Sequence, residues 1–271
     1  MPELPEVEVI ARGLHSTLCG RTIASAPHVD LTRLSEPAET LLPGIEGQTI
    51  SRAYRRAKVL LVELASGVTM AFHLKMTGRV VHGPMRPPDK HDRLFLALDD
   101  GSLLSFSDMR KFGYARSFAP GELAQWDFLK RCGPEPLETS PAQLADRIKG
   151  RKGKIKALLL DQSVVVGVGN IYADESLFRA GIHPEARGHT LSRVRLVTLF
   201  GVLQDVLKQA IAENGSSIRD YVNADGDAGA FQNSFNVYGK KGELCTACKT
   251  PLKVVKVAGR TSTFCPKCQQ R

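Results

Sequence analysis

The chain has 271 residues, of which 42% are hydrophobic and 24% charged, and its formal net charge is +9. This length suits two domains of ordinary size with a small appendage, and the composition is that of a globular protein. The sequence has no run of about eighteen apolar residues, and its first charges are acidic, which argues against a membrane span and a secretion signal. We therefore expect a protein of the reducing cytoplasm.

The first half of the chain combines one helix with several short strands. Apolar residues recur at helical spacing over residues 8–18. Short apolar and β-branched runs separated by turn residues follow this segment. The expected strands cover residues 49–54, 59–64, 68–74, 93–98 and 103–107. Many short strands joined by such turns predict an antiparallel sandwich or barrel.

The second half is predicted to be mainly helical. Gly133-Pro134-Glu135-Pro136 ends the strand pattern, and we interpret residues 133–141 as a linker. The expected helices cover residues 142–149, 153–161, 171–180, 191–213 and 216–223. The Gly167-Val168-Gly169 turn can bring backbone N–H groups close to a phosphate, with Asn170 capping the next helix. A glycine-rich turn between helices is more often only a turn, so this motif is weak by itself.

The last twenty-seven residues carry the most specific motif. Cys245-x2-Cys248 and Cys265-x2-Cys268 are separated by sixteen residues. Paired cysteines at this separation are typical of a four-thiolate zinc site, because each pair turns two sulfurs toward one tetrahedral ion. Four protein ligands leave no open position for a substrate, so we expect one structural Zn²⁺ per chain. The alternative is two disulfides, which the repeated two-residue spacing and the reducing compartment disfavour.

The excess positive charge lies in the second half of the chain. Residues 1–140 hold 17 Lys and Arg against 17 Asp and Glu, whereas residues 141–271 hold 20 against 11. A basic half beside a neutral half indicates a polyanionic partner, DNA or RNA before a membrane surface. A merely solvated basic face gives the same count, so charge alone does not decide the partner.

The N-terminus offers a candidate nucleophile. Removal of Met1 would give Pro2 a free α-amino group, whose reference pKa of about 7.7–8.0 lies far below the value of about 10.4 for lysine. Such an amine is partly unprotonated near neutral pH and can attack a sugar carbon to form a Schiff base. Glu3, beside it, can act as a general acid, and Glu6 as a second carboxylate or a structural anchor. Without other motifs, the segment is more typical of a helix start.

Several motifs in order resemble one known family. They are the PELPEVE start, Arg56-Ala57-Lys58, Lys90-His91-Asp92, Arg110-Lys111-Phe112-Gly113, Gly167-Val168-Gly169-Asn170-Ile171-Tyr172 and the zinc module with Arg260. Over essentially its whole length the chain resembles formamidopyrimidine-DNA glycosylase. The resemblance implies a bifunctional base-excision repair enzyme, a DNA glycosylase and AP lyase that removes 8-oxoguanine and formamidopyrimidines. Its implied partner is double-stranded DNA with oxidised bases or abasic sites, bound by a monomer in the bacterial cytoplasm, at the nucleoid.

The resemblance also assigns roles to residues. Pro2 is implied to be the nucleophile at C1′, Glu3 the general acid, and Lys58 a lysine near the lesion and its phosphate. Read alone, Lys58 would be a strand lysine with a solvated head. The implied trio that fills the void left by an extruded base is Met76, Arg110 and Phe112, and an apolar wedge, a guanidinium and a ring suit that task. Read alone, Met76 and Phe112 would be core residues.

The implied DNA contacts fall on both halves of the chain. They are His91, Arg110, Lys156, Asn170, Tyr172 and Arg260. Arg260 lies in the zinc hairpin, where the family inserts an arginine into the minor groove. Residues 216–236 match the family's lesion-capping region, which varies among members.

Some motif positions depart from the family pattern. The usual His-Leu-Gly-Met-Ser-Gly has Lys75 and Thr77 here, and the usual Asp-Pro-Arg-Arg-Phe-Gly has Met109 and Lys111. The void-filling residues survive, so we expect intact chemistry with altered DNA contacts. An endonuclease VIII-like enzyme for oxidised pyrimidines is an alternative, which Leu4 disfavours because that branch usually begins Pro-Glu-Gly-Pro-Glu. A non-catalytic DNA-binding protein is another alternative.

These features together predict an α+β multidomain protein. Residues 1–132 are expected to form the catalytic domain, an antiparallel β-sandwich with flanking helices, and residues 133–141 the linker. Residues 142–242 are expected to form a helical DNA-binding domain with a helix-two-turn-helix element. Residues 243–271 are expected to form the four-cysteine zinc-finger hairpin.

Overall fold

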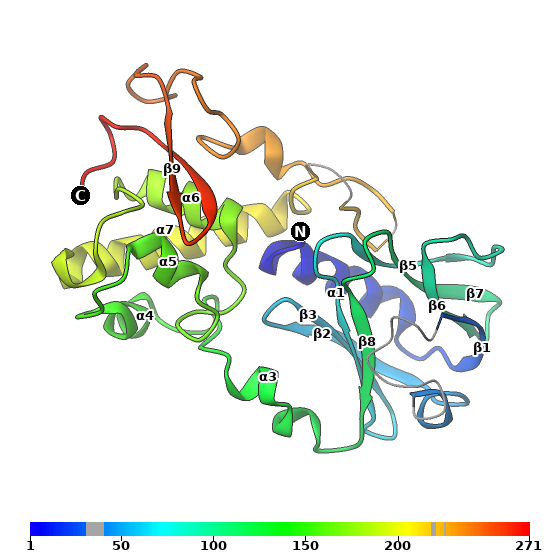
Figure 1. The fold of residues 1–271 in the computed structure, drawn as a ribbon. Helices are drawn as coiled ribbons and strands as arrows, with labels where there is room; N and C mark the ends of the chain where they lie inside the picture. The colour runs from blue at the N-terminus through cyan, green and yellow to red at the C-terminus, as the bar shows by residue number, and fades with distance from the viewer. Residues whose placement is uncertain (31–40, 218–220, 225) are drawn as a thin grey trace. The chain divides into compact units, whose positions relative to one another are not determined.

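The computed structural model describes residues 1–30, 41–217, 221–224 and 226–271 (Figure 1). They form two compact units, one of Met1–Lys130 with Glu213–Ala230 and the other of Arg131–Ala212 with Phe231–Arg271. This division differs from the expected order of domains. Residues 213–230, which fall within the expected helical domain of 142–242, belong to the first unit.

The first unit contains two four-stranded antiparallel sheets. Their strand orders are β1-β6-β7-β5 and β2-β3-β4-β8. The strands are β1 (Ile23–Val29), β2 (Ile50–Arg56), β3 (Val59–Leu64), β4 (Thr69–His73), β5 (Gly78–Pro84), β6 (Asp92–Leu98), β7 (Ser102–Asp108) and β8 (Tyr114–Phe118). One apolar core takes residues from both sheets, such as Leu60 and Val62 from β3 and Leu94 and Leu96 from β6. The expected β-sandwich is thereby confirmed.

Helix α1 (Leu4–Leu18) contributes one apolar face to that core through Val7, Ile10, Leu14 and Leu18. The helix begins with a capping box, in which the Glu3 side chain accepts from the N3 backbone N–H and the Glu6 side chain accepts from the Glu3 N–H. Because Pro5 lacks an N–H, it fits the first turn, where helical donors have no partner. The expected helix over residues 8–18 therefore starts four residues earlier than its apolar spacing indicates.

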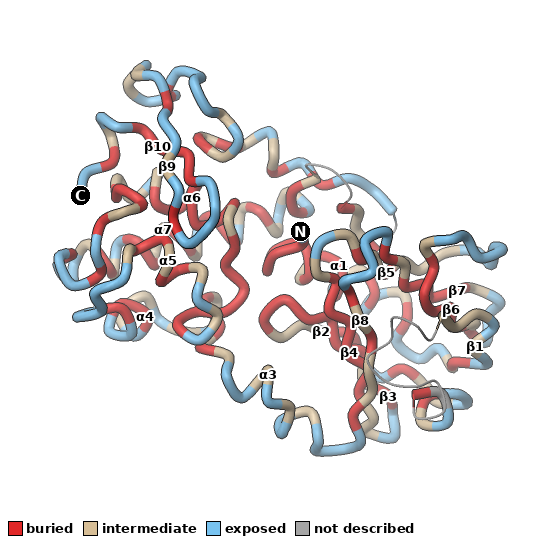
Figure 2. Tube along the Cα trace, in the orientation of Figure 1, coloured by how far each residue is buried: buried red, intermediate tan, exposed pale blue. Residues whose placement is uncertain are grey.

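The outer face of the second sheet is also apolar. Side chains alternate along β3, so Val59 and Leu61 point away from the main core and pack with Phe118. Trp126 and Phe128, from the segment with η3 (Leu123–Gln125) and α3 (Asp127–Lys130), cover them. Figure 2 shows β3 and β4 as almost continuously buried, which agrees with this cover on both faces.

The second unit is built on helix α7 (Arg193–Ala212), against which α4 (Pro141–Ile148) and α6 (Asn170–Arg179) pack. Helix α5 (Ile155–Leu160) packs on α6, and β9 (Lys253–Val257) and β10 (Arg260–Phe264) form a hairpin near the C-terminus. The second unit also contains the 3-10 turns η4 (Gly188–Thr190) and η5 (Phe231–Ser234), and η2 (Leu42–Gly44) lies in the first unit.

Among the described residues, no helix is long and apolar enough to cross a lipid bilayer.

One expected helix is wrong where it can be assessed. Residues 216, 217 and 221–223 are not helical, and 218–220 lie outside the described residues. The backbone N–H of Ser216 donates to Glu6 rather than to a residue four positions back, and the Ser217 hydroxyl bonds the Tyr221 carbonyl. These distant and side-chain partners replace the helical ladder.

Candidate active site and nucleic-acid interface

The N-terminal residues are fixed by one buried carboxylate. Glu6, 1% exposed, accepts hydrogen bonds from the Glu3 N–H at 2.8 Å and from the Ser216 N–H at 2.9 Å. The Tyr221 hydroxyl donates to the Glu6 carbonyl at 3.4 Å, and burial raises the pKa of this tyrosine. Glu6 therefore has the geometry of an anchor between the chain start and residues 213–230. Pro2 and Glu3 are buried beside it, whereas Met1 is 51% exposed.

Lys58 lies in the tight turn between β2 and β3, after Ala57 with its left-handed φ of 55°. Its side chain is buried, and its positive charge acts on His73 at the end of β4. Burial, followed by the charges of Lys75 and Lys58, lowers the pKa of His73 to about 3. His73 is therefore neutral at physiological pH and accepts a hydrogen bond from the Lys75 N–H on Nδ1.

The void-filling trio forms one cluster on the first unit. Arg110 Nη1 lies 3.0 Å from the Met76 sulfur, and its guanidinium carbon lies 4.8 Å from the centre of the Phe112 ring. Met76 is 39% exposed and Phe112 is 53% exposed. These values exclude the core interpretation of the two apolar residues. An exposed wedge, cation and ring are available to enter a partner.

A buried aspartate holds the two loops that carry this trio. Asp108 accepts from the Thr77 hydroxyl at 2.5 Å, from the Arg110 N–H at 3.1 Å and from the Gly113 N–H at 2.6 Å. The Arg110 N–H also reaches the Thr77 hydroxyl oxygen at 3.0 Å. Lys111 between them has a left-handed φ of 58°. The Met76 loop and the Arg110 loop are thus tied through one side chain.

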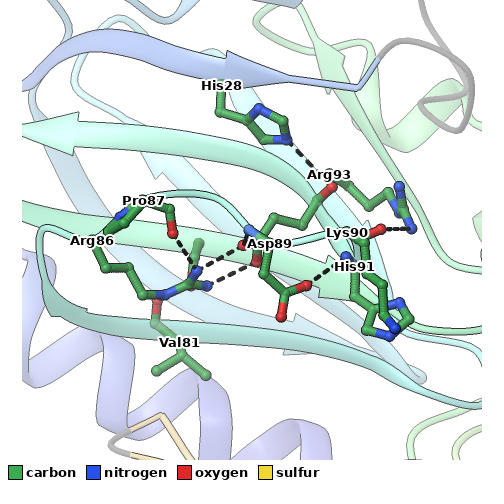
Figure 3. A network of polar contacts seen from close by, with 10 residues as sticks. His28, Val81, Arg86, Pro87, Asp89, Lys90, His91 and Arg93 are labelled. Carbon is green, nitrogen blue, oxygen red and sulfur yellow. Dashed lines mark hydrogen bonds and ion pairs between the residues drawn. The ribbon is translucent and has the colours of Figure 1, made fainter.

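The loop that carries His91 is ordered by acidic side chains (Figure 3). Arg86 donates hydrogen bonds from both terminal nitrogens to the Asp92 carboxylate, at 2.7 and 2.8 Å, and Asp92 also accepts from the Asp89 N–H. Burial opposes ionisation of Asp92, but these donors outweigh it and lower the pKa of Asp92. Asp89 in turn accepts from the His91 N–H at 2.6 Å. The half-buried His91 therefore has a fixed backbone.

Arg93 connects this loop to the void-filling loops. Its guanidinium pairs with Asp30 and donates to the carbonyls of Lys90 and Asp108, at 3.1 and 3.3 Å. The Asp108 N–H donates to the His91 carbonyl at 2.8 Å. The loop of His91, the expected phosphate contact, is thus hydrogen-bonded to Asp108, which also holds the Met76 and Arg110 loops.

In the second unit, the turn before α6 is braced by a glutamine. Gln162 Oε1 accepts from the Gly167 N–H at 2.9 Å, and its Nε2 donates to the carbonyls of Leu160 and Val168. Gly167 has a φ of 81°, which favours glycine. The N-cap of α6 is Gly169 and not Asn170, which is the first helical residue. The expected cap is therefore displaced by one position.

Two of the expected DNA-contact side chains are fully buried in the second unit. Lys156 Nζ lies 2.7 Å from Asp174 Oδ1, and the Tyr172 ring stacks on Phe231 with 5.6 Å between centroids. Their side chains face protein here, in contrast to the expected phosphate contacts. Asn170 is half-buried and donates to the Thr261 carbonyl, and Arg260 is exposed; their contacts with DNA stay predictions.

Arg260 follows the tight turn between β9 and β10. Ala258 and Gly259 have φ of 50° and 72°, and positive φ at both central positions is the geometry of a two-residue hairpin turn. Val257 pairs with Arg260 across the turn. The turn therefore presents Arg260 at the tip of the hairpin.

The four C-terminal cysteines converge as a metal site. Their sulfurs all lie within 4.8 Å of one another, with 3.4 Å between Cys248 and Cys265 and 3.9 Å between Cys245 and Cys268. A disulfide requires about 2.05 Å, whereas four thiolates about 2.3 Å from one zinc ion lie roughly 3.8 Å apart. The residues present therefore fit one structural zinc ion and not two disulfides.

Sequence reasoning missed the polar residues whose hydrogen bonds hold these sites. Asp108, Gln162 and Glu175 are examples, and Glu175 accepts from the N–H groups of Asn236, Val237 and Tyr238, each at 2.9 Å. Glu175 lies next to Asp174 in the middle of α6, where a sequence pattern suggests solvated charge. The partners of Glu175 lie 61 to 63 positions away, whereas Gln162 and Asp108 bond mostly within six positions, in turns whose hydrogen bonds the residue pattern does not specify.

Comparisons with known proteins give one consistent result. Three family models match: the formamidopyrimidine-DNA glycosylase N-terminal domain over residues 1–115, its H2TH domain over 132–222, and the zinc finger found in FPG and IleRS over 242–271. The formamidopyrimidine-DNA glycosylase of Nitratidesulfovibrio vulgaris is 48% identical over 97% of this chain and 75% of its own length.

Solved structures give the same result. Lactococcus lactis Fpg (MutM) with DNA containing N7-benzyl-Fapy-dG has a TM-score of 0.92 and 35% identity, covering 100% of both chains. MutM in complex with DNA containing carbocyclic 8-oxo-G has a TM-score of 0.91 and 35% identity, again over 100% of both chains.

Proposed function

Because this chain belongs to the formamidopyrimidine-DNA glycosylase family, we propose that it excises oxidised purines from duplex DNA through a Schiff base on Pro2. The activity is that of a bifunctional DNA glycosylase and AP lyase of base excision repair. The observation that carries the assignment of Pro2 is its position. The residue is buried directly beside Glu3 and the Glu6 anchor, at the end of the chain that Met1 removal would free.

The chemistry assigned to the N-terminus runs in two stages. The Pro2 amine attacks C1′, and the bond from C1′ to the base breaks. The base leaves with the bonding electrons and takes up the proton that the Pro2 nitrogen loses. Glu3 gives a proton to the sugar ring oxygen, so that the ring opens and the amine lone pair forms the iminium. Loss of a C2′ proton then expels the 3′ phosphate, and a second elimination expels the 5′ phosphate. Water finally releases the sugar remnant from Pro2.

The other residues bind and orient DNA in this proposal. Lys58 is assigned to the lesion and its phosphate, and His91, Asn170 and Arg260 to DNA contacts. The exposed cluster of Met76, Arg110 and Phe112 is assigned to the void left by the extruded base, with Arg110 toward the orphaned base. The structural zinc ion, when bound by its four cysteines, holds the end of the chain that carries Arg260.

We further propose that one chain acts alone, on DNA of the bacterial nucleoid. Every residue assigned above, including the four zinc ligands, comes from a single chain. Light scattering of the free protein and of its complex with a short duplex should give one chain per duplex. Two chains in either sample would contradict this proposal.

Borohydride trapping tests the reaction and the nucleophile together. The Met1-free chain is incubated with a duplex carrying 8-oxoguanine opposite cytosine, reduced, digested and mapped by mass spectrometry. We expect an adduct on Pro2, and none on Pro2 in a chain that retains Met1, because its Pro2 nitrogen is an amide. An adduct formed only with an oxidised pyrimidine would indicate the endonuclease VIII-like alternative. Tight binding without any adduct would support a non-catalytic protein.

A further inference from the structure

The helix-two-turn-helix region and the zinc hairpin are joined by one buried ion pair. Lys156 on α5 and Asp174 on α6 are 0% and 2% exposed, with 2.7 Å between Nζ and Oδ1. Each also reaches the backbone of β10. Lys156 Nζ donates to the Thr261 carbonyl at 3.1 Å, and Asp174 Oδ2 accepts from the Thr263 N–H at 3.1 Å.

Asn170 adds a third side chain to the same strand. Its Nδ2 donates to the Thr261 carbonyl at 3.2 Å, so two donors converge on one carbonyl. Thr261 directly follows Arg260, at the tip of the hairpin. Within the described residues the hairpin pairs with no other strand. Contacts of this kind therefore fix the place of Arg260 relative to α5 and α6.

A role in stability alone is the competing explanation. Burial raises the pKa of Asp174 to about 6, against the opposing effect of the Lys156 ammonium, so desolvation of this pair is costly. An apolar pair of similar volume often stabilises a core as well as a buried ion pair does. Such a pair would, however, leave the Thr261 carbonyl and the Thr263 N–H without these partners. The ion pair therefore contributes hydrogen bonds that set the position of β10 along α5 and α6.

We propose that Lys156 is a positioning residue that acts with Asp174 to hold β10, so that Arg260 meets DNA at a defined place. This assignment replaces the expected contact between Lys156 and a phosphate. It rests on the DNA-contact role of Arg260 under the proposed function.

A double-mutant cycle in the zinc-loaded, full-length protein tests this proposal. The variants are Lys156→Met with Asp174→Asn, Arg260→Ala, and all three changes together. The amide oxygen introduced by Asp174→Asn can still accept from the Thr263 N–H, so no buried charge is left unpaired. Binding is measured against a duplex that carries a stable, reduced abasic site, which the enzyme cannot cleave. We expect the paired change to weaken binding about tenfold when Arg260 is present, and less than about twofold in the Arg260→Ala chain.

The salt dependence gives a second measurement. If displacement of β10 takes the Arg260 charge away from the DNA, the slope of log affinity against log salt should fall by about 0.9 in the paired variant. It should not fall further in the triple variant. Lys154→Met is the matched control, because Lys154 lies just before α5 but pairs with the surface residue Glu185. It should weaken binding equally with and without Arg260.

Two results would overturn the proposal. Equal losses with and without Arg260 would show that Lys156 acts through DNA contact or general stability. No effect of Arg260→Ala would remove the role of Arg260, and with it this inference, whereas the Pro2 chemistry is tested separately by borohydride trapping. Zinc content and thermal unfolding are measured for each variant. If the paired variant does not fold, Asp174→Asn alone, which retains the Lys156 bond to Thr261, is placed in the same cycle with a smaller expected coupling.

Discussion

The hydroxyl of Thr77 offers the sharpest test of how the void-filling loops are held. Thr77→Val preserves shape but removes the donor to Asp108 at 2.5 Å and the acceptor for the Arg110 N–H at 3.0 Å. A hydrogen bond to a charged group contributes about 1.5–3 kcal/mol. Because Thr77 is only half-buried, water can partly replace the hydroxyl, and we expect a loss near the lower limit, about 1.5 kcal/mol.

A loss of that size corresponds to about a tenfold change in an equilibrium. We therefore expect single-turnover excision of 8-oxoguanine opposite cytosine to slow by up to about tenfold, if the ordered loops are needed to insert Arg110. Strand cleavage at a preformed abasic site requires no base extrusion and should change less than about threefold. Unfolding in urea reports the loss of stability.

Thr77→Ser is the matched control because serine keeps the hydroxyl. It should restore the excision rate to within about twofold of the unmodified chain, at a small cost from the lost methyl group. If Thr77→Ser is as slow as Thr77→Val, the hydroxyl is not the cause. If Thr77→Val excises 8-oxoguanine at the full rate, the hydrogen bonds of Thr77 to Asp108 and Arg110 do not limit the insertion of Arg110.

Three further predictions concern stability and metal. The pKa of His73 is lowered to about 3, from an unfolded value of about 6.5, so acid should destabilise the native state between these values. Between about pH 7.5 and pH 5, the unfolding free energy of the unmodified chain should fall by about 2 kcal/mol more than that of His73→Gln. Parallel curves of unfolding free energy against pH for the two chains would contradict a neutral, buried His73. Glu175→Gln should destabilise the chain by about 2–4 kcal/mol in denaturant titrations, because four hydrogen bonds lose a charged acceptor. Glu185→Gln should cost under about 1 kcal/mol, because the half-buried Glu185 pairs with the exposed cations of Lys154 and Arg271. Zinc removal by a chelator should weaken duplex binding by more than about tenfold and zinc should restore it; full binding by the stripped protein would refute a structural metal.

The sequence predicted what depends on local pattern. The short apolar runs of β3 and β6, the helical spacing of α1 and α7, and the cysteine spacing each encode their structure over a few residues. The edge strand β1 escaped prediction because most of its residues are not buried, and β5 because it contains glycine and proline. Met76 and Phe112, which the residue pattern alone assigned to the core, are exposed, and their role as a wedge stays a prediction from the family resemblance.

Partners far apart in sequence could not be predicted. Lys156 and Tyr172 look like surface residues of a basic helical region, yet Asp174 and Phe231 enclose them. Likewise, the N–H of Ser216 bonds Glu6 across 210 positions. A single sequence carries no signal for such pairings, because each residue type is compatible with a solvated position as well.

The return of residues 213–230 to the first unit bears on how the chain is made. During synthesis, Glu6 leaves the ribosome long before Ser216 and Tyr221, its later partners. The helices from α4 to α7 emerge in this interval, whereas Phe231–Arg271, which completes the second unit, emerges only after Ser216 and Tyr221. The N-terminus with its proposed nucleophile is thus the first part of the enzyme to be synthesised and among the last to gain its full surroundings. In a nascent chain stalled before residue 213, Glu6 should therefore lack its bonds to Ser216 and Tyr221, and the surroundings of Pro2 should be incomplete.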